Sequence, residues 1–168
     1  MTSREDYDEQ QWQLLLEAPR CAAMGVVVID FGLVDFAKEA AVMVRFAQQA
    51  QAMYAHNTLI QDVLAETTST ERSTGWHVPW RDLSHDDGRG DRSRPERIAE
   101  QLLDRLAAAV KLLDERGDAA EAREFKEFLY AYADRVARAS GEGFLGGGDK
   151  VSFKEAAFLR RLQAVLGL

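Results

Sequence analysis

The chain contains few of the residues that build disulfide frameworks, metal sites and loop-rich folds. Its 168 residues include one cysteine, three histidines and three prolines. The lone cysteine, Cys21, cannot form an internal disulfide, and its apolar neighbours favour a small buried hydrophobe over a nucleophile. Few prolines and few convincing strand segments together indicate an all-helical fold, in a reducing compartment such as the cytoplasm.

The motifs of common enzyme classes are also missing. There is no Gly-x-Ser-x-Gly elbow and no His-Glu-x-x-His pair, which excludes the usual serine-hydrolase and zinc-protease signatures. The glycine-rich segment 141–148 follows a predicted helix, whereas a phosphate-binding loop follows a strand. Four polar residues of one loop have a spacing that matches no compact metal motif: His77, His85, Asp86 and Asp87. We therefore expect a protein that is not an enzyme.

Basic charge is in deficit. The chain has 21 lysines and arginines against 28 acidic residues, a net charge of −7, which argues against binding to nucleic acid or to an anionic membrane. The acidic excess lies in residues 1–67. A solvated acidic face is the usual explanation of such an excess, and cation binding is the alternative. The first residues also lack a signal-peptide pattern, so we expect a cytoplasmic protein.

The most apolar window of the chain, residues 19–29, predicts a buried helix. Pro19 suits a first helical turn, where its missing N–H would have no partner. Residues 21–29 carry no charge, and a helix that is apolar all round belongs inside a core or a membrane. The window is too short for a bilayer, which needs about 20 apolar residues. A buried strand would also suit residues 26–29, but no strand partner is evident.

Apolar residues at a spacing of three to four predict further helices before and after this window. In the helix predicted over 36–56, the apolar stripe consists of Phe36, Ala40, Met43, Val44, Ala47, Ala50 and Tyr54. Helix starts are indicated by polar caps at Asp6 or Asp8, Asp35, Asn57, Ser93, Asp118 and Ser152. Ser152 and Glu155 together predict a capping box. The predicted fold is all-α: one compact domain over residues 1–168, with six or seven helices around the buried helix 19–29.

Residues 68–93 interrupt this pattern. They mix Ser, Thr, Gly, Asp and Arg without a helical period, and a loop of that length in a compact domain is usually functional or disordered. We expect a long mobile loop here. Trp76 and Trp80 gain nothing from solvent, so they either dock on the body of the protein or bind a partner.

Two predicted helix starts resemble each other. Residues 33–41 and 150–157 share a Val, then Asp or Ser, then Phe, Lys, Glu and two alanines, and each follows a glycine and an acidic residue. Helix capping by itself favours this composition. An internal duplication of a helix pair is the other explanation.

An apolar helix, an Asp/Gly turn and a Val-Ser-x-x-Glu start to a helix ending Leu-Gly-Leu resemble the TerB-like family of tellurite-resistance proteins. The resemblance covers residues 146–168 closely and residues 26–41 loosely. It implies a small all-helical fold of pseudo-repeated helix pairs, with a stress-response role. It also implies acidic residues at two turns that hold a divalent cation, calcium or manganese, which prefer oxygen ligands; these residues are Asp30, Asp35, Glu39, Asp149 and Glu155.

Two functions of different class follow. The first is a non-enzymatic, acidic helical protein that binds a divalent cation or acts in a stress response. The second is a protein–protein interaction or structural module whose Trp76/Trp80 loop binds a protein partner or a second copy. Neither function predicts contact with nucleic acid or with a membrane.

Overall fold

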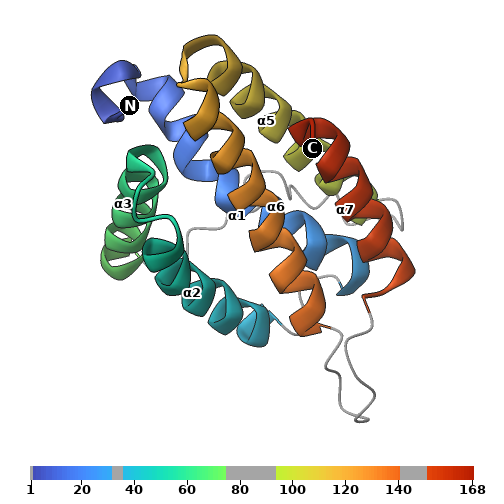
Figure 1. Ribbon diagram of the computed structural model, residues 1–168. Helices are drawn as coiled ribbons and strands as arrows, with labels where there is room; N and C mark the ends of the chain where they lie inside the picture. The colour runs from blue at the N-terminus through green and yellow to red at the C-terminus, as the bar shows by residue number, and fades with distance from the viewer. Residues whose placement is uncertain (1, 32–35, 75–93, 141–150) are drawn as a thin grey trace.

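The computed structural model describes residues 2–31, 36–74, 94–140 and 151–168 (Figure 1). Across these ranges the chain forms six α-helices and one short 3-10 helix, with no strand, so the prediction of an all-α fold is confirmed. The elements are η1 (Arg4–Asp6), α1 (Glu9–Phe31), α2 (Phe36–Met53), α3 (Thr58–Thr74), α5 (Arg94–Arg116), α6 (Ala119–Ser140) and α7 (Phe153–Leu166).

Helix α1 runs through the middle of the bundle. It packs against α5, α6 and α7 along its length and makes smaller contacts with α2 and α3 (Figure 1). Its apolar side chains from Cys21 to Val28 are all buried. The predicted buried helix is therefore confirmed, and the rest of the fold is arranged around it.

The helix boundary predicted at Pro19 is wrong, because α1 continues through the proline. A proline inside a helix costs about 3 kcal/mol, whereas full burial of one large apolar side chain contributes about 1.5–3 kcal/mol. The segment before Pro19 buries Trp12 and Leu15 almost completely, and the Trp12 Nε1–H donates to Glu66 Oε2 at 2.7 Å. Burial of this first half in the common core therefore outweighs the local cost of the proline.

This continuity lengthens the apolar segment beyond the predicted window. Residues Glu9–Ile29 form a 21-residue stretch that is long and apolar enough to cross a bilayer by length and composition. Within the bundle, 67% of the 18-residue window that meets this test is buried. The central helix of a globular core has the same composition.

The boundary predicted at residue 68 is also wrong, because α3 continues to Thr74. The Thr68 hydroxyl donates to the Leu64 carbonyl at 2.7 Å, and the Ser69 hydroxyl donates to the Glu66 carbonyl at 2.9 Å. The hydroxyl groups of Ser and Thr thus hydrogen-bond to carbonyls one turn back while their own backbone stays helical. The remainder of the predicted loop, with Trp76 and Trp80, lies outside the described residues.

In α2 the buried stripe is rotated from the predicted one. Met43 and Ala50 are buried as expected, but Val44 is 40% exposed and Phe46 takes a core position. The Phe46 ring stacks on the Tyr132 ring of α6 with centroids 5.2 Å apart. The Tyr132 hydroxyl also donates to the Met43 carbonyl at 3.2 Å. Aromatic contacts with α6 therefore decide which face of α2 is buried.

Helix α7 begins with the predicted capping box. The Glu155 N–H donates to Ser152 Oγ at 3.1 Å, and the Ser152 N–H donates to Glu155 Oε2 at 2.7 Å. The helix ends at Gly167, whose φ of 70° is the left-handed conformation that glycine adopts at low cost. Between these ends, α7 buries Phe158, Leu159, Leu162 and Leu166.

We predict that Ser152→Ala lowers the free energy of unfolding by about 0.5–2 kcal/mol, since it removes the acceptor for the Glu155 N–H. Urea denaturation followed by circular dichroism measures the change. Ser152→Asp retains a capping oxygen and is the control, with a midpoint close to that of the unsubstituted protein. Equal midpoints for the alanine and aspartate variants would contradict a stabilising cap.

The close approach of α7 to α1 requires a glycine. A Cβ atom at Gly25 would lie 1.9 Å from Cζ of Phe158, well inside contact distance. We predict that Gly25→Ala destabilises the fold by about 1–3 kcal/mol through overpacking. Helix propensity alone predicts the opposite sign, a gain of up to about 1 kcal/mol.

A double-mutant cycle with Phe158→Leu tests the cause of this effect. The smaller side chain makes room for the alanine, so Gly25→Ala should cost less in the Phe158→Leu background. If Gly25→Ala raised the melting temperature of the protein, or if its cost were unchanged in that background, the contact would not constrain the fold.

Candidate anion-binding groove

Most of the acidic residues and tryptophans predicted to form sites lie where side chains are not described. Asp30 and Glu39 belong to the end of α1 and the start of α2, but their side chains lie outside the description. Asp35, Asp149, Trp76 and Trp80 lie outside the described residues altogether. Glu155 is the one predicted ligand whose side chain can be assessed.

The Glu155 carboxylate has a structural role at the start of α7. It is buried, and it accepts the hydrogen bond from the Ser152 N–H that closes the capping box. Among the side chains that the structure describes, no group of three or more His, Cys, Asp or Glu could hold a metal ion. The cation site therefore stays a prediction that depends on Asp30, Asp35, Glu39 and Asp149.

A different site lies between α2 and α6. The two helices run antiparallel, since Tyr54 near the end of α2 packs edge-on against Phe128, and Met43 near its start contacts Tyr132 further along α6. Beside this seam is a groove of about 380 Å³. It is lined by Val42, Arg45, Phe46, Gln49, Arg135, Arg138 and Ala139.

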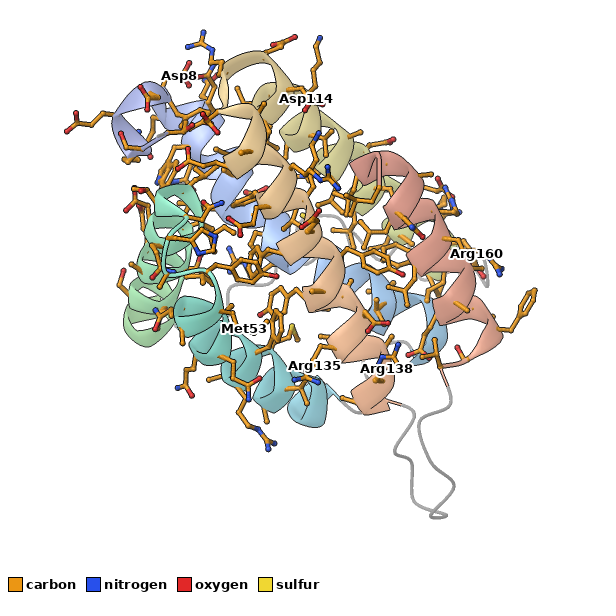
Figure 2. The ribbon with its side chains drawn as sticks, viewed as in Figure 1. Asp8, Met53, Asp114, Arg135, Arg138 and Arg160 are labelled. Atoms are coloured by element: carbon orange, nitrogen blue, oxygen red, sulfur yellow. The ribbon has the colours of Figure 1, made fainter. Side chains whose placement is uncertain are left out.

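Helical spacing explains how these side chains meet. On α2 the lining residues recur at three to four positions from 42 to 49, and on α6 they occupy 135, 138 and 139, so each set lies on one helical face. Phe46 is buried and forms the floor, whereas Arg45, Arg135 and Arg138 are exposed. Figure 2 shows Arg135 and Arg138 near the C-terminal end of α6, and both line the groove.

The groove carries a positive charge. Arg138 is bound by the Asp134 carboxylate through Nε and Nη2, at 2.7 and 3.1 Å. Arg135 Nη2 donates to Gln49 Oε1 at 3.5 Å, and Arg45 Nε donates to the Ala41 carbonyl at 3.4 Å, both neutral acceptors. Among the described side chains, the three lining guanidinium groups and the Asp134 carboxylate sum to a charge of +2.

This arrangement is suited to binding anions. A guanidinium group presents paired N–H donors that match a carboxylate or a phosphate, and it stays charged at every physiological pH. The groove-lining residues in the described part of the chain include no nucleophile and no general base. The groove can therefore hold an anionic group, but those residues provide no chemistry to transform it.

A larger hollow, of about 480 Å³, lies near the turn between α5 and α6. Its lining includes Arg123 and Lys126, but each has a carboxylate partner. Lys126 Nζ lies 2.5 Å from Asp114 Oδ1, and Arg123 Nε lies 3.0 Å from Glu127 Oε1. With its cations already paired, this hollow is a weaker candidate than the groove between α2 and α6.

The sequence did not reveal the groove. Arg45 is about 90 residues from Arg135 and Arg138 along the sequence, and the net charge of the chain is negative, which favours predictions based on carboxylates. The one local signal is the pair Arg135 and Arg138, three apart on the charged face of a predicted helix. Their joint role with Arg45 depends on the pairing of α2 with α6.

The fold and site together define an acidic helical bundle with a basic groove between α2 and α6. Searches of family models, curated proteins and solved structures found no match to this chain.

The environment of Cys21 lowers the reactivity of its thiol. Burial, and to a lesser extent the charge of Glu17, raises the pKa of Cys21 to about 12. The thiolate is the reactive form, so a shift of about three units leaves roughly a thousandfold less thiolate near pH 8.

We predict that a chromogenic thiol reagent labels Cys21 in the native protein at least a thousandfold more slowly than in 8 M urea at the same pH. Burial blocks access and also keeps the proton on sulfur. Complete labelling in urea is the control for reagent quality. Native labelling within tenfold of the denatured rate would show that Cys21 is accessible and that the core opens there.

Proposed function

We propose that this chain is a non-enzymatic interaction module that holds an acidic segment of a partner protein in the groove between α2 and α6. The observation that supports the proposal is the placement of Arg45 and Arg135. Both face a concave surface without a carboxylate partner in the described part of the chain, on a protein with a net charge of −7.

Three other arginines of the described chain contrast with these two. Arg4, Arg105 and Arg161 are each paired with a glutamate, as expected where acidic residues are in excess. In the groove, the Asp134 carboxylate offsets the charge of Arg138. The two further guanidinium groups therefore repel Arg138 less than they repel each other. An incoming carboxylate would relieve that repulsion and gain charge-assisted hydrogen bonds.

The extent of the groove favours a peptide over a small anion. Its α2 wall runs from Val42 to Gln49, about 10 Å at 1.5 Å per residue. Positive charge spread over that length suits several carboxylates on one chain better than a single phosphate. Met53 continues the 42–46–49 stripe by one helical turn and is 58% exposed, and methionine side chains adapt to varied apolar partners. An acidic segment with an apolar residue fits both features.

The two functions predicted from the sequence are related to this proposal in different ways. An interaction module was the second of them, although it was assigned to Trp76 and Trp80. The divalent cation depends on acidic residues whose side chains lie outside the description, and it stays a prediction. The TerB-like resemblance and the stress-response role also stay predictions.

Fluorescence anisotropy with a labelled Glu-rich peptide that contains one leucine tests the proposal at low salt. We predict saturable binding, and at least a tenfold loss of affinity in Arg135→Glu, about 1.4 kcal/mol. The same peptide with glutamine in place of glutamate should not bind.

Arg160→Glu is the matched control for this experiment. Arg160 is exposed on α7, away from the groove (Figure 2), and its reversal changes the net charge by the same amount. Its affinity should stay within twofold of the unsubstituted protein. An equal loss in both variants would show only a response to net charge, and the groove would not be the binding site.

A further inference from the structure

The end of the bundle remote from the groove carries an exposed group of carboxylates: Glu5, Asp6, Asp8 and Asp118. We call this group the acidic end. The first three belong to η1 and the start of α1, and Asp118 precedes α6. The segments are tied together, because the Asp118 N–H donates to Thr2 Oγ1 at 2.8 Å and the Thr2 N–H donates to Glu121 Oε2 at 2.5 Å.

None of these four carboxylates forms an ion pair with lysine or arginine among the described residues, although Arg4 and Arg116 lie at the same end of the bundle. Three of the four, all except Glu5, accept hydrogen bonds from backbone N–H groups. Asp8 accepts from Gln11 at 2.9 Å, Asp6 from Ser3 at 2.8 Å, and Asp118 from Ala120 at 3.0 Å. Backbone hydrogen bonds from Glu121 and Ala120 also lower the pKa of Asp118, which keeps it ionised.

The acidic end and the groove lie at opposite ends of the bundle. Figure 2 shows Asp8 at the top of the view and Arg135 with Arg138 at the bottom. Helix α6 connects the two, beginning beside Asp118 and reaching the arginines near its last turns. Its 22 residues span about 33 Å, so the acidic end of one chain cannot reach its own groove.

We propose that the acidic segment held in the groove is the acidic end of a second copy of this chain, giving head-to-tail association. The inference rests on the proposed function and names the partner. The surfaces are complementary in sign: four exposed carboxylates meet a groove with a net charge of +2. Because the two surfaces are different and lie at opposite ends, the contact is heterologous, and a pair of copies keeps one free groove and one free acidic end.

This geometry has two consequences that can be measured. Association continues beyond the dimer, since each added copy exposes a new groove or a new acidic end. It also weakens as salt is added, because exposed charges are screened over about 10 Å at 0.1 M ionic strength. A symmetric dimer would stop at two copies.

Two variants each disable one of the two surfaces and leave the other intact. The groove variant, Arg45→Glu with Arg135→Glu, retains the acidic end. The end variant carries Glu5→Lys, Asp8→Ser and Asp118→Ser and retains the groove. Serine is as good a helix cap as aspartate, so the end variant loses charge without losing the caps of α1 and α6. Circular dichroism and melting temperature establish that both variants are folded.

Sedimentation velocity at about 20 mM and 300 mM NaCl provides the test. We expect the unsubstituted protein to gain mass with concentration at low salt, and each variant alone to stay monomeric. An equimolar mixture of the two variants should form a species of twice the mass of one chain and no larger one. In that mixture a single competent contact, between the intact acidic end and the intact groove, is possible.

The outcomes distinguish this inference from the proposed function. If the unsubstituted protein stays monomeric at low salt but still binds the Glu-rich peptide, head-to-tail association is wrong and the interaction module stands. If the protein associates but the mixed variants do not pair, another surface causes association and the inference is also wrong. If neither peptide binding nor association is observed, both proposals fail.

Discussion

The fold depends on the close contact of α1 with the three helices that enclose it. At Gly25 the absence of a side chain admits the Phe158 ring of α7, and a Cβ atom there would force that ring to shift. Along the rest of α1, small and branched side chains are fully buried against α5 and α6. Tight packing of this kind tolerates little change in volume, and it fixes the positions of the outer helices relative to one another.

Helix α6 connects the packed core to the groove at the surface. Its inner face buries Phe125, Leu129 and Val136 in the core. Phe128 and Tyr132 form an aromatic cluster with Phe46, with neighbouring ring centroids 5.2–6.2 Å apart. Aromatic pairs add to the burial of apolar area, so this cluster holds α2 against α6. The arginine groove is the outer edge of the same seam, and its shape depends on the cluster beneath it.

The distribution of charge matters more for recognition here than its total. A net charge of −7 predicts repulsion from other acidic molecules. Locally, however, the groove is positive, and the remote end of the bundle is negative. Charges separated by more than about 10 Å are largely screened at 0.1 M ionic strength, so each surface acts on a partner almost independently. An acidic protein can therefore present a basic binding site, provided that its own carboxylates lie elsewhere.

The sequence alone determined the features that arise within a few residues. The helical periods, the caps at Asp8, Asn57, Asp118 and Ser152, and the burial of residues 21–28 depend on contacts three or four positions apart or on local composition. Tertiary structure decided the rest. Pro19 stays inside α1, Phe46 replaces Val44 in the core, and Arg45 meets Arg135, because packing between helices distant in sequence outweighs local preference. A pattern read along one helix cannot show which of its faces a neighbour will cover, since the shape of that neighbour sets the free energy of the contact.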